Sequence, residues 1–234
     1  MGWSKLVASA ADAVADVPDG ATVFCGGFGG SGYPEHLIQA LADRRVRGLT
    51  IISNNAGHGP LFAYGGIRRL ICSYPLGPSS RPFLDPLERG EVELELELEA
   101  QGTLAERIRA GGAGLGGVLT PVGVDTSFAG DKPVIEVDGR RCLLAKPLRA
   151  DFAFIRAQTA DPWGNLMYRH ASRNFNALMA LAADVVIAEV REVVDLGRLD
   201  PDAIHTPGPF VDRVVVIPDH ERTADRPTRE RSTG

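Results

Sequence analysis

The segment that most constrains the fold of this chain is a glycine-rich run between an apolar and an amphipathic segment. Residues 26–32 read Gly-Gly-Phe-Gly-Gly-Ser-Gly; the apolar run 21–25 precedes them and the amphipathic run 35–45 follows. Strand, glycine-rich turn and helix, in this order, form the unit with which open α/β sheets bind phosphate-bearing ligands. Glycine accepts positive φ angles and lets backbone N–H groups approach a ligand. A purely structural turn is the alternative.

Three of these glycines also have the spacing of a dinucleotide fingerprint. Gly27, Gly29 and Gly32 fit G-x-G-x-x-G, but that fingerprint requires an acidic residue about 20 positions further on, at the end of the second strand. Here the second apolar run is followed by Asn54 and Asn55. The sequence therefore disfavours a dinucleotide and leaves a phosphate- or pantetheine-bearing ligand as the functional interpretation.

Amide side chains supply the other candidate site residues. Asn54 and Asn55 follow the second strand, where ligands bind in open parallel sheets, and they donate hydrogen bonds without adding charge; an ordinary turn explains them equally well. The backbone N–H of Gln101 is a candidate for an oxyanion site, with an ordinary loop as the alternative. Thr103 and Glu106 have the spacing of a capping box, which predicts a helix with Thr103 as its N-cap and explains Glu106 without a nucleophilic role.

Alternation of apolar runs with helical patterns predicts an α/β fold with an open, mostly parallel sheet and helices on both faces. The alternating leucines and glutamates of 91–99 predict a half-solvated strand near the sheet edge. A hairpin is expected around Asp138-Gly139, in a small antiparallel excursion over residues 118–148. We expect residues 1–217 to form one domain and the charged tail 218–234 to be disordered.

Composition excludes several classes of function. The chain has 234 residues, a net charge of −5 and three widely spaced cysteines. It shows no basic stripe for nucleic acid, no membrane-spanning run and no metal-ligand spacing, so we expect a cytoplasmic protein without a metal, with Cys25, Cys72 and Cys142 as buried free thiols. Neither a Ser/His/Asp order nor a nucleophile elbow appears. The chain thus offers a binding site and no convincing nucleophile.

Five motifs in order give the sequence a family resemblance. The segments GATVFCGGFGGSGYPEHL, SNNAG, QGTLAERIRAGGAG, ADPWGNLMYRHASRNFN and HTPG resemble the α subunit of family I coenzyme A transferases, whose fold is the CoA-transferase/NagB-like type. The resemblance spans about residues 5 to 217. Within the family, ICSYP and DPWGNLMYR are most similar to the 3-oxoadipate subgroup.

The resemblance implies a transfer of CoA from succinyl-CoA to a 3-oxoacid, 3-oxoadipate above all, by ping-pong chemistry. A glutamate nucleophile is then expected on a partner β subunit, in a heterodimer or α2β2 assembly. Acyl-CoA and small carboxylic acids are substrates, with no permanently bound cofactor. The alternatives are an acetoacetate transferase, a CoA-ester hydrolase or lyase on the same fold, and a CoA-binding interaction subunit without a working partner.

The resemblance also assigns roles to residues. Gln101 matches a glutamine whose backbone amide serves the oxyanion site, and Asn54 and Asn55 match residues of the same pocket. The segment assigned to CoA binding corresponds to Gly26, Gly27, Phe28, Gly29, Gly30, Ser31 and Gly32.

Two segments depart from the family pattern. Many relatives have Cys-Gly-Ile at 31–33, where this chain has Ser-Gly-Tyr, and Thr-Pro at 99–100, where it has Glu-Ala. Loss of that proline is expected to loosen the loop that presents Gln101. We further expect Gly29→Val to block the glycine loop through crowding by the new Cβ.

Overall fold

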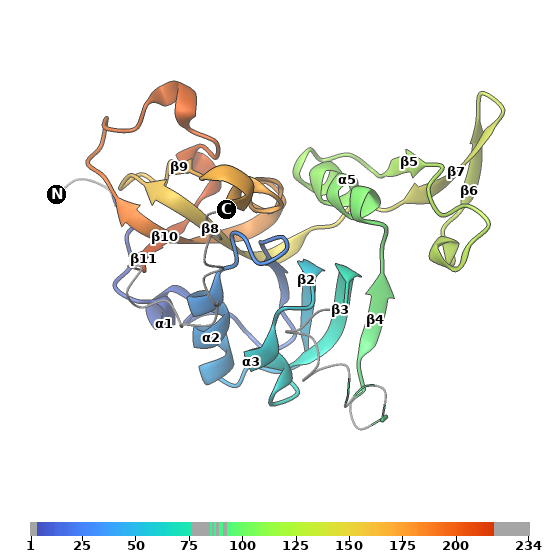
Figure 1. Cartoon of the computed structure of the whole chain (residues 1–234), viewed down its shortest axis with the longest axis horizontal. Helices are drawn as coiled ribbons and strands as arrows, with labels where there is room; N and C mark the ends of the chain where they lie inside the picture. Colours follow the sequence, from blue (N-terminus) through green and yellow to red (C-terminus); the bar gives the residue numbers. More distant parts are fainter. Residues whose placement is uncertain (1–3, 76–84, 86, 88, 91–92, 218–234) are drawn as a thin grey trace, which may run out of the picture.

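A parallel sheet forms the centre of the computed structural model, which describes residues 4–75, 85, 87, 89–90 and 93–217 (Figure 1). Its strand order is β11-β10-β8-β1-β2-β3-β4, and all of these neighbours pair in parallel, as predicted. The short strand β9 (Leu166–Met167) adds an antiparallel pair to β8. The bounds of the seven parallel strands are β1 Thr22–Cys25, β2 Leu49–Asn55, β3 Ile67–Tyr74, β4 Glu95–Leu98, β8 Ala150–Ala160, β10 Ala183–Val193 and β11 Arg213–Val216.

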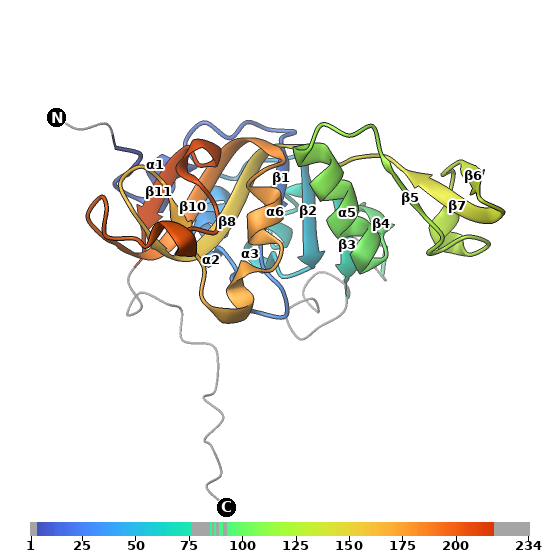
Figure 2. The ribbon, with the colours of Figure 1, turned by 90° about the horizontal axis from the view of Figure 1, so that it is seen from above.

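Helices cover both faces of this sheet (Figure 2), which confirms the predicted architecture. One face carries α1 (Ala10–Ala13), α2 (Glu35–Asp43) and α3 (Gly59–Phe62); the other carries α5 (Gln101–Gly112) and α6 (Asn176–Met179). Two apolar cores result, because successive strand residues point to opposite faces. In β1, Val23 belongs to the core under α2, and Phe24 belongs to the core under α5.

The antiparallel excursion is confirmed as a separate small sheet that extends away from the main sheet (Figure 1). Its order is β5 (Val118–Thr120), β7 (Arg140–Ala145) and β6 (Val134–Val137). Asp138 and Gly139 make the hairpin turn with φ angles of +50° and +72°, the left-handed pair that a two-residue turn of type I′ requires.

Other short elements are 3₁₀ helices, at Ser127–Ala129 (η2), His170–Arg173 (η3), Pro201–Ala203 (η4) and Gly208–Phe210 (η5). No helix in the described ranges is long and apolar enough to cross a membrane. The three cysteines are buried and free, as expected. The predicted tail, 218–234, lies outside the described residues.

Two boundaries were predicted incorrectly around β4. This strand is an edge strand as expected, but it covers only Glu95–Leu98, and 91–92 lie outside the described residues. The capping box is wrong: α5 begins at Gln101, its N-cap is Ala100, and no side chain caps it. The backbone of Glu99 still hydrogen-bonds to Cys72 of β3, so the chain turns directly afterwards. Packing of the helix against the core then buries Thr103 inside its first turn.

Candidate functional site

The structure brings the predicted amide residues together in one hydrogen-bonded chain. Nε2 of Gln101 donates to Oδ1 of Asn54 at 2.7 Å. Nδ2 of Asn54 then donates to Oδ1 of Asn55, also at 2.7 Å, and the backbone N–H of Gly29 donates to the same oxygen at 3.2 Å. Gly29 follows β1, Asn54 and Asn55 end β2, and Gln101 follows β4. The chain of amides therefore lies at the carboxyl edge of the parallel sheet, where ligands bind in this architecture.

Gln101 also presents its backbone N–H at this edge. It is the first residue of α5, and the first hydrogen bond of that helix runs from N–H of Leu104 to the carbonyl of Ala100. The N–H groups of the opening helical turn have no acceptor within their helix. The Gln101 N–H therefore has no acceptor within α5, while its side chain holds Asn54; its role in an oxyanion site stays a prediction.

Tyr33, at one of the departures from the family pattern, supports the end of β2. Its hydroxyl donates to the carbonyl of Asn55 at 3.2 Å and accepts from N–H of Gly57 at 3.0 Å. The ring lies against Gly27, where an added Cβ would collide with it, and Gly57 is equally close to the hydroxyl. Tyrosine is larger than the isoleucine that many relatives have at position 33, and it fits here because Gly27 and Gly57 lie beside it. Its hydroxyl fixes the backbone at Asn55.

The glycine loop itself uses most of its donors internally. Phe28 and Ser31 exchange backbone hydrogen bonds of 3.0 and 2.8 Å, and N–H of Gly26 donates to the carbonyl of Phe154. Phe28, Gly29 and Gly30 are exposed, so the loop still offers a surface to a ligand. Its role in CoA binding stays a prediction.

The N-terminus of α2, where a phosphate was expected to bind, already holds a carboxylate of the protein. Oε2 of Glu189, from β10, accepts from the N–H groups of His36 at 2.9 Å and of Leu37 at 3.3 Å. Glu189 is fully buried. An anion at this position is stabilised by the free N–H groups and by the helix dipole. Glu189 already occupies these two donors, and phosphate binding by the glycine loop stays a prediction.

Crowding is the wrong reason for the expected effect at Gly29. A Cβ added there meets no atom within 4 Å, although its φ of +54° is unfavourable for other residues. Three other glycines of the loop are crowded. An added Cβ would collide with Asn176 at Gly26 and with Tyr33 at Gly27, and at Gly32 it would lie 2.7 Å from the carbonyl of Ser172.

A buried ion cluster holds the junction between β4 and α5. One guanidinium nitrogen of Arg107 contacts carboxylate oxygens of Glu97 and Glu99, each at 2.7 Å, and Nζ of Lys132 lies 3.5 Å from Glu99. Glu99 and Arg107 are only 4% and 8% exposed. In place of the family's proline, this cluster therefore anchors the residue that stands two positions before Gln101.

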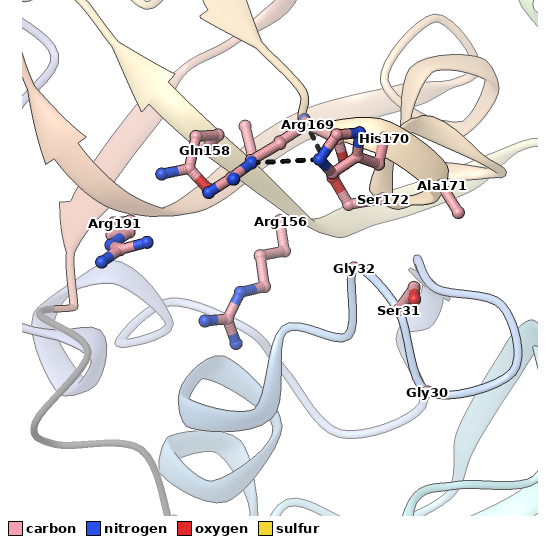
Figure 3. A pocket seen from close by; sticks show the side chains of 11 residues that line it. Gly30, Ser31, Gly32, Arg156, Gln158, Arg169, His170, Ala171, Ser172 and Arg191 are labelled. Atoms are coloured by element: carbon pink, nitrogen blue, oxygen red, sulfur yellow. Dashed lines mark hydrogen bonds between the residues drawn. The ribbon is translucent and has the colours of Figure 1, made fainter. Parts of the chain in front are cut away.

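The sequence analysis did not predict a cavity of about 350 Å³ that lies beside the glycine loop (Figure 3). Gly30 to Gly32 line one side, and Arg156, Arg169 and Arg191 contribute guanidinium groups from β8, from the segment before η3, and from β10. No local pattern in the sequence signals it, because the three arginines are dispersed over 36 residues of chain.

Comparisons with known proteins agree with this architecture. A family profile described as coenzyme A transferase matches residues 7–216. A 3-oxoadipate CoA-transferase subunit from Pseudomonas putida is 47% identical over 219 residues, which cover 92% of this chain and 94% of the relative. The corresponding subunit of a probable succinyl-CoA:3-ketoacid coenzyme A transferase from Bacillus subtilis is 42% identical over 238 residues, with 98% and 97% covered.

A solved structure shows the same fold. The acyl-CoA transferase apoenzyme of Escherichia coli O157:H7 superimposes with a TM-score of 0.83 at 27% identity, over 96% of this chain and 49% of that one. This chain therefore spans about half the length of that transferase. On the family match and the two close relatives, the chain belongs to the coenzyme A transferase family.

Proposed function

We propose that this chain is the α subunit of a transferase that moves CoA from succinyl-CoA to 3-oxoadipate. The relatives from Pseudomonas putida and Bacillus subtilis support the reaction class and both substrates. The observation that carries the proposal is the amide chain Gln101–Asn54–Asn55–Gly29 at the carboxyl edge of the sheet. Such a group of uncharged donors suits an acyl-CoA thioester and its oxyanion, with CoA entering as a substrate and no permanently bound cofactor.

The nucleophile belongs, in this proposal, to a partner β subunit. Glu99 is committed to Arg107 and Lys132, and Glu106 forms an exposed pair with Arg109 at 2.7 Å. Neither carboxylate near Gln101 is therefore placed to attack a thioester. This chain matches only 49% of the Escherichia coli acyl-CoA transferase chain. In this proposal, the partner subunit corresponds to the other half of that chain. The assembly is then a heterodimer or an α2β2 tetramer.

The chemistry is a double displacement through covalent intermediates. The partner's glutamate attacks the thioester carbonyl, the CoA thiolate leaves, and a mixed anhydride forms. The thiolate then attacks the glutamyl carbonyl, which releases succinate and leaves a glutamyl thioester. The 3-oxoacid carboxylate repeats both steps in reverse. Each attack creates an oxyanion, and the Gln101 N–H with its neighbouring amides stabilises that charge.

Co-expression with the adjacent-gene partner tests the proposal. The purified complex is assayed with succinyl-CoA and either 3-oxoadipate, acetoacetate or no acceptor. We expect 3-oxoadipate to be the preferred acceptor. Preference for acetoacetate would instead support the activity named for the Bacillus subtilis relative, and rapid CoA release without an acceptor would show a hydrolase.

A further inference from the structure

We infer that the pocket of Arg156, Arg169 and Arg191 binds the distal carboxylate of a dicarboxylic substrate. This inference rests on the proposed function, in which the succinyl group and 3-oxoadipate each carry a second carboxylate that acetoacetate lacks. It makes the arginine pocket the element that selects a dianionic acid.

The position of the pocket favours a ligand. The chain builds β1 to β4 in one direction across the sheet and then returns to place β8, β10 and β11 on the other side of β1. The strand order reverses between β1 and β8, and open α/β sheets bind ligands at such a switch point. The pocket occupies it: Gly30 to Gly32 follow β1, and Arg156 and Gln158 lie on β8 beyond Phe154, the partner of the last β1 residue.

The chemistry of the pocket favours an anion. Arginine side chains come from three separate segments, His170 adds a further ring, and none of the described lining residues is Asp or Glu. Figure 3 shows the guanidinium groups of Arg156, Arg169 and Arg191 around the same space, with the side chain of Gln158 beside Arg169. Guanidinium groups bind carboxylates through paired, charge-assisted hydrogen bonds.

Arg156 is fixed in advance by buried partners. One of its guanidinium nitrogens lies 3.1 Å from Oε1 of Glu189 and donates to the carbonyl of Tyr33 at 3.2 Å. Nδ1 of His36 lies 3.2 Å from the same carboxylate oxygen. The Arg156 side chain is only 10% exposed. A side chain held by two neighbouring segments, one of them through an ion pair, loses little conformational freedom when a ligand binds.

A carboxylate suits this pocket better than the phosphates of CoA. Several of the usual phosphate donors are already engaged, since the N–H groups of His36 and Leu37 bind Glu189 and those of Phe28 and Ser31 bind each other's carbonyls. A volume of about 350 Å³ is near the lower end of ligand pockets, which suits a small acid. Gly29 contacts Asn55 while the adjacent Gly30 lines the pocket, so an acid lying along the loop reaches both places.

The test compares acceptors in the complete α–β complex. Arg169→Gln and Arg191→Gln are each assayed at saturating succinyl-CoA, with 3-oxoadipate and with acetoacetate, so that any effect on the donor cancels in the ratio of the two kcat/KM values. Arg141→Gln, at an exposed arginine of the small sheet, is the matched control. We expect the ratio of 3-oxoadipate to acetoacetate to fall at least tenfold in both pocket variants, mainly through KM, and to stay constant in the control.

Each other outcome has a definite meaning. An equal loss of kcat/KM with both acceptors would overturn the inference. A rise confined to the KM for CoA substrates would also overturn it, because it would assign the pocket to the phosphates of CoA. Calorimetric titration of the complex with succinate and with acetate gives a second reading, because only succinate binding should weaken in the variants. If the wild-type complex transfers CoA to neither acceptor, the proposed function itself fails.

Discussion

Nε2 of Gln101 donates a 2.7 Å hydrogen bond to Oδ1 of Asn54, although 47 residues of chain separate them. The bond joins the start of α5 to the end of β2. Asn54 is only 1% exposed, so its amide depends on these internal partners. The side chain of Gln101 therefore positions Asn54.

Gln101→Ala should lower kcat of the α–β complex about fivefold, because loss of one hydrogen bond is worth roughly 1 kcal/mol and leaves Asn54 less well held. Steady-state kinetics with a saturating acceptor measure the effect. Gln39→Ala is the matched control, since Gln39 is exposed on α2 and its side-chain amide donates to Asp43 of the same helix. Unchanged kcat in Gln101→Ala would show that the side chain does not position Asn54.

Substitutions in the glycine loop should distinguish backbone strain alone from strain combined with crowding. Gly27→Ala places a Cβ against the ring of Tyr33 at a φ of +112° and should destabilise the chain by about 2 kcal/mol or more. Gly29→Ala meets open space at a φ of +54° and should cost only about 1 kcal/mol. Gly29→Asn should cost less still, because asparagine tolerates this conformation. Denaturant unfolding gives the order; equal losses at both glycines would contradict it.

The buried cluster around Arg107 should be important for stability. Arg107→Met leaves the buried Glu99 without its guanidinium partner, while Glu97 keeps its pair with Arg69, and losing one member of a buried ion pair costs roughly 3 kcal/mol. Its control, Arg109→Met, removes an exposed pair on the same helix and should change little. The two midpoints of urea unfolding are compared; similar midpoints would mean that the cluster contributes no more than a surface pair.

Acid should destabilise the chain through His58. This ring is fully buried, with one nitrogen 2.9 Å from Oγ of Ser53, and burial lowers its pKa from 6.5 to about 3. As pH falls below 6.5, the unfolded chain gains a proton that the folded chain does not take up, so stability decreases with falling pH.

Between pH 6.5 and about 5 this loss amounts to roughly 2 kcal/mol of unfolding free energy. The measurement is urea unfolding of wild type and His58→Gln at both pH values. The variant starts from a lower stability, because Ser53 loses its hydrogen bond to the His58 ring, but its pH dependence should be shallower. Parallel curves for the two proteins would show that His58 is not the titrating group.

The sequence was most informative where structure is set locally. Apolar runs predicted the central strands, and Asp138-Gly139 predicted the hairpin, because a two-residue turn is specified by its own residues. Asn55 and Gly29 were expected at one sheet edge because both follow strands of a parallel sheet. The structure adds that they share a hydrogen bond.

Long-range contacts set what the sequence did not reveal. Glu189 binds the N-terminus of α2 although it lies 153 positions further along the chain. No local sequence pattern predicts such a contact. The start of α5 depends on the ladder between β3 and β4, which outweighed the capping signal of Thr103 and Glu106. The arginine pocket depends on β8 and β10 lying in register, with Arg156 opposite Glu189.

The most direct test of the central claim locates the covalent intermediate. The α–β complex is incubated with succinyl-CoA without an acceptor, digested, and examined by mass spectrometry for a glutamyl–CoA thioester. The predicted result is a thioester on a glutamate of the partner β subunit, with none on this chain, which without its partner forms no adduct and transfers no CoA. A thioester on Glu99, Glu106 or any other glutamate of this chain would contradict the account.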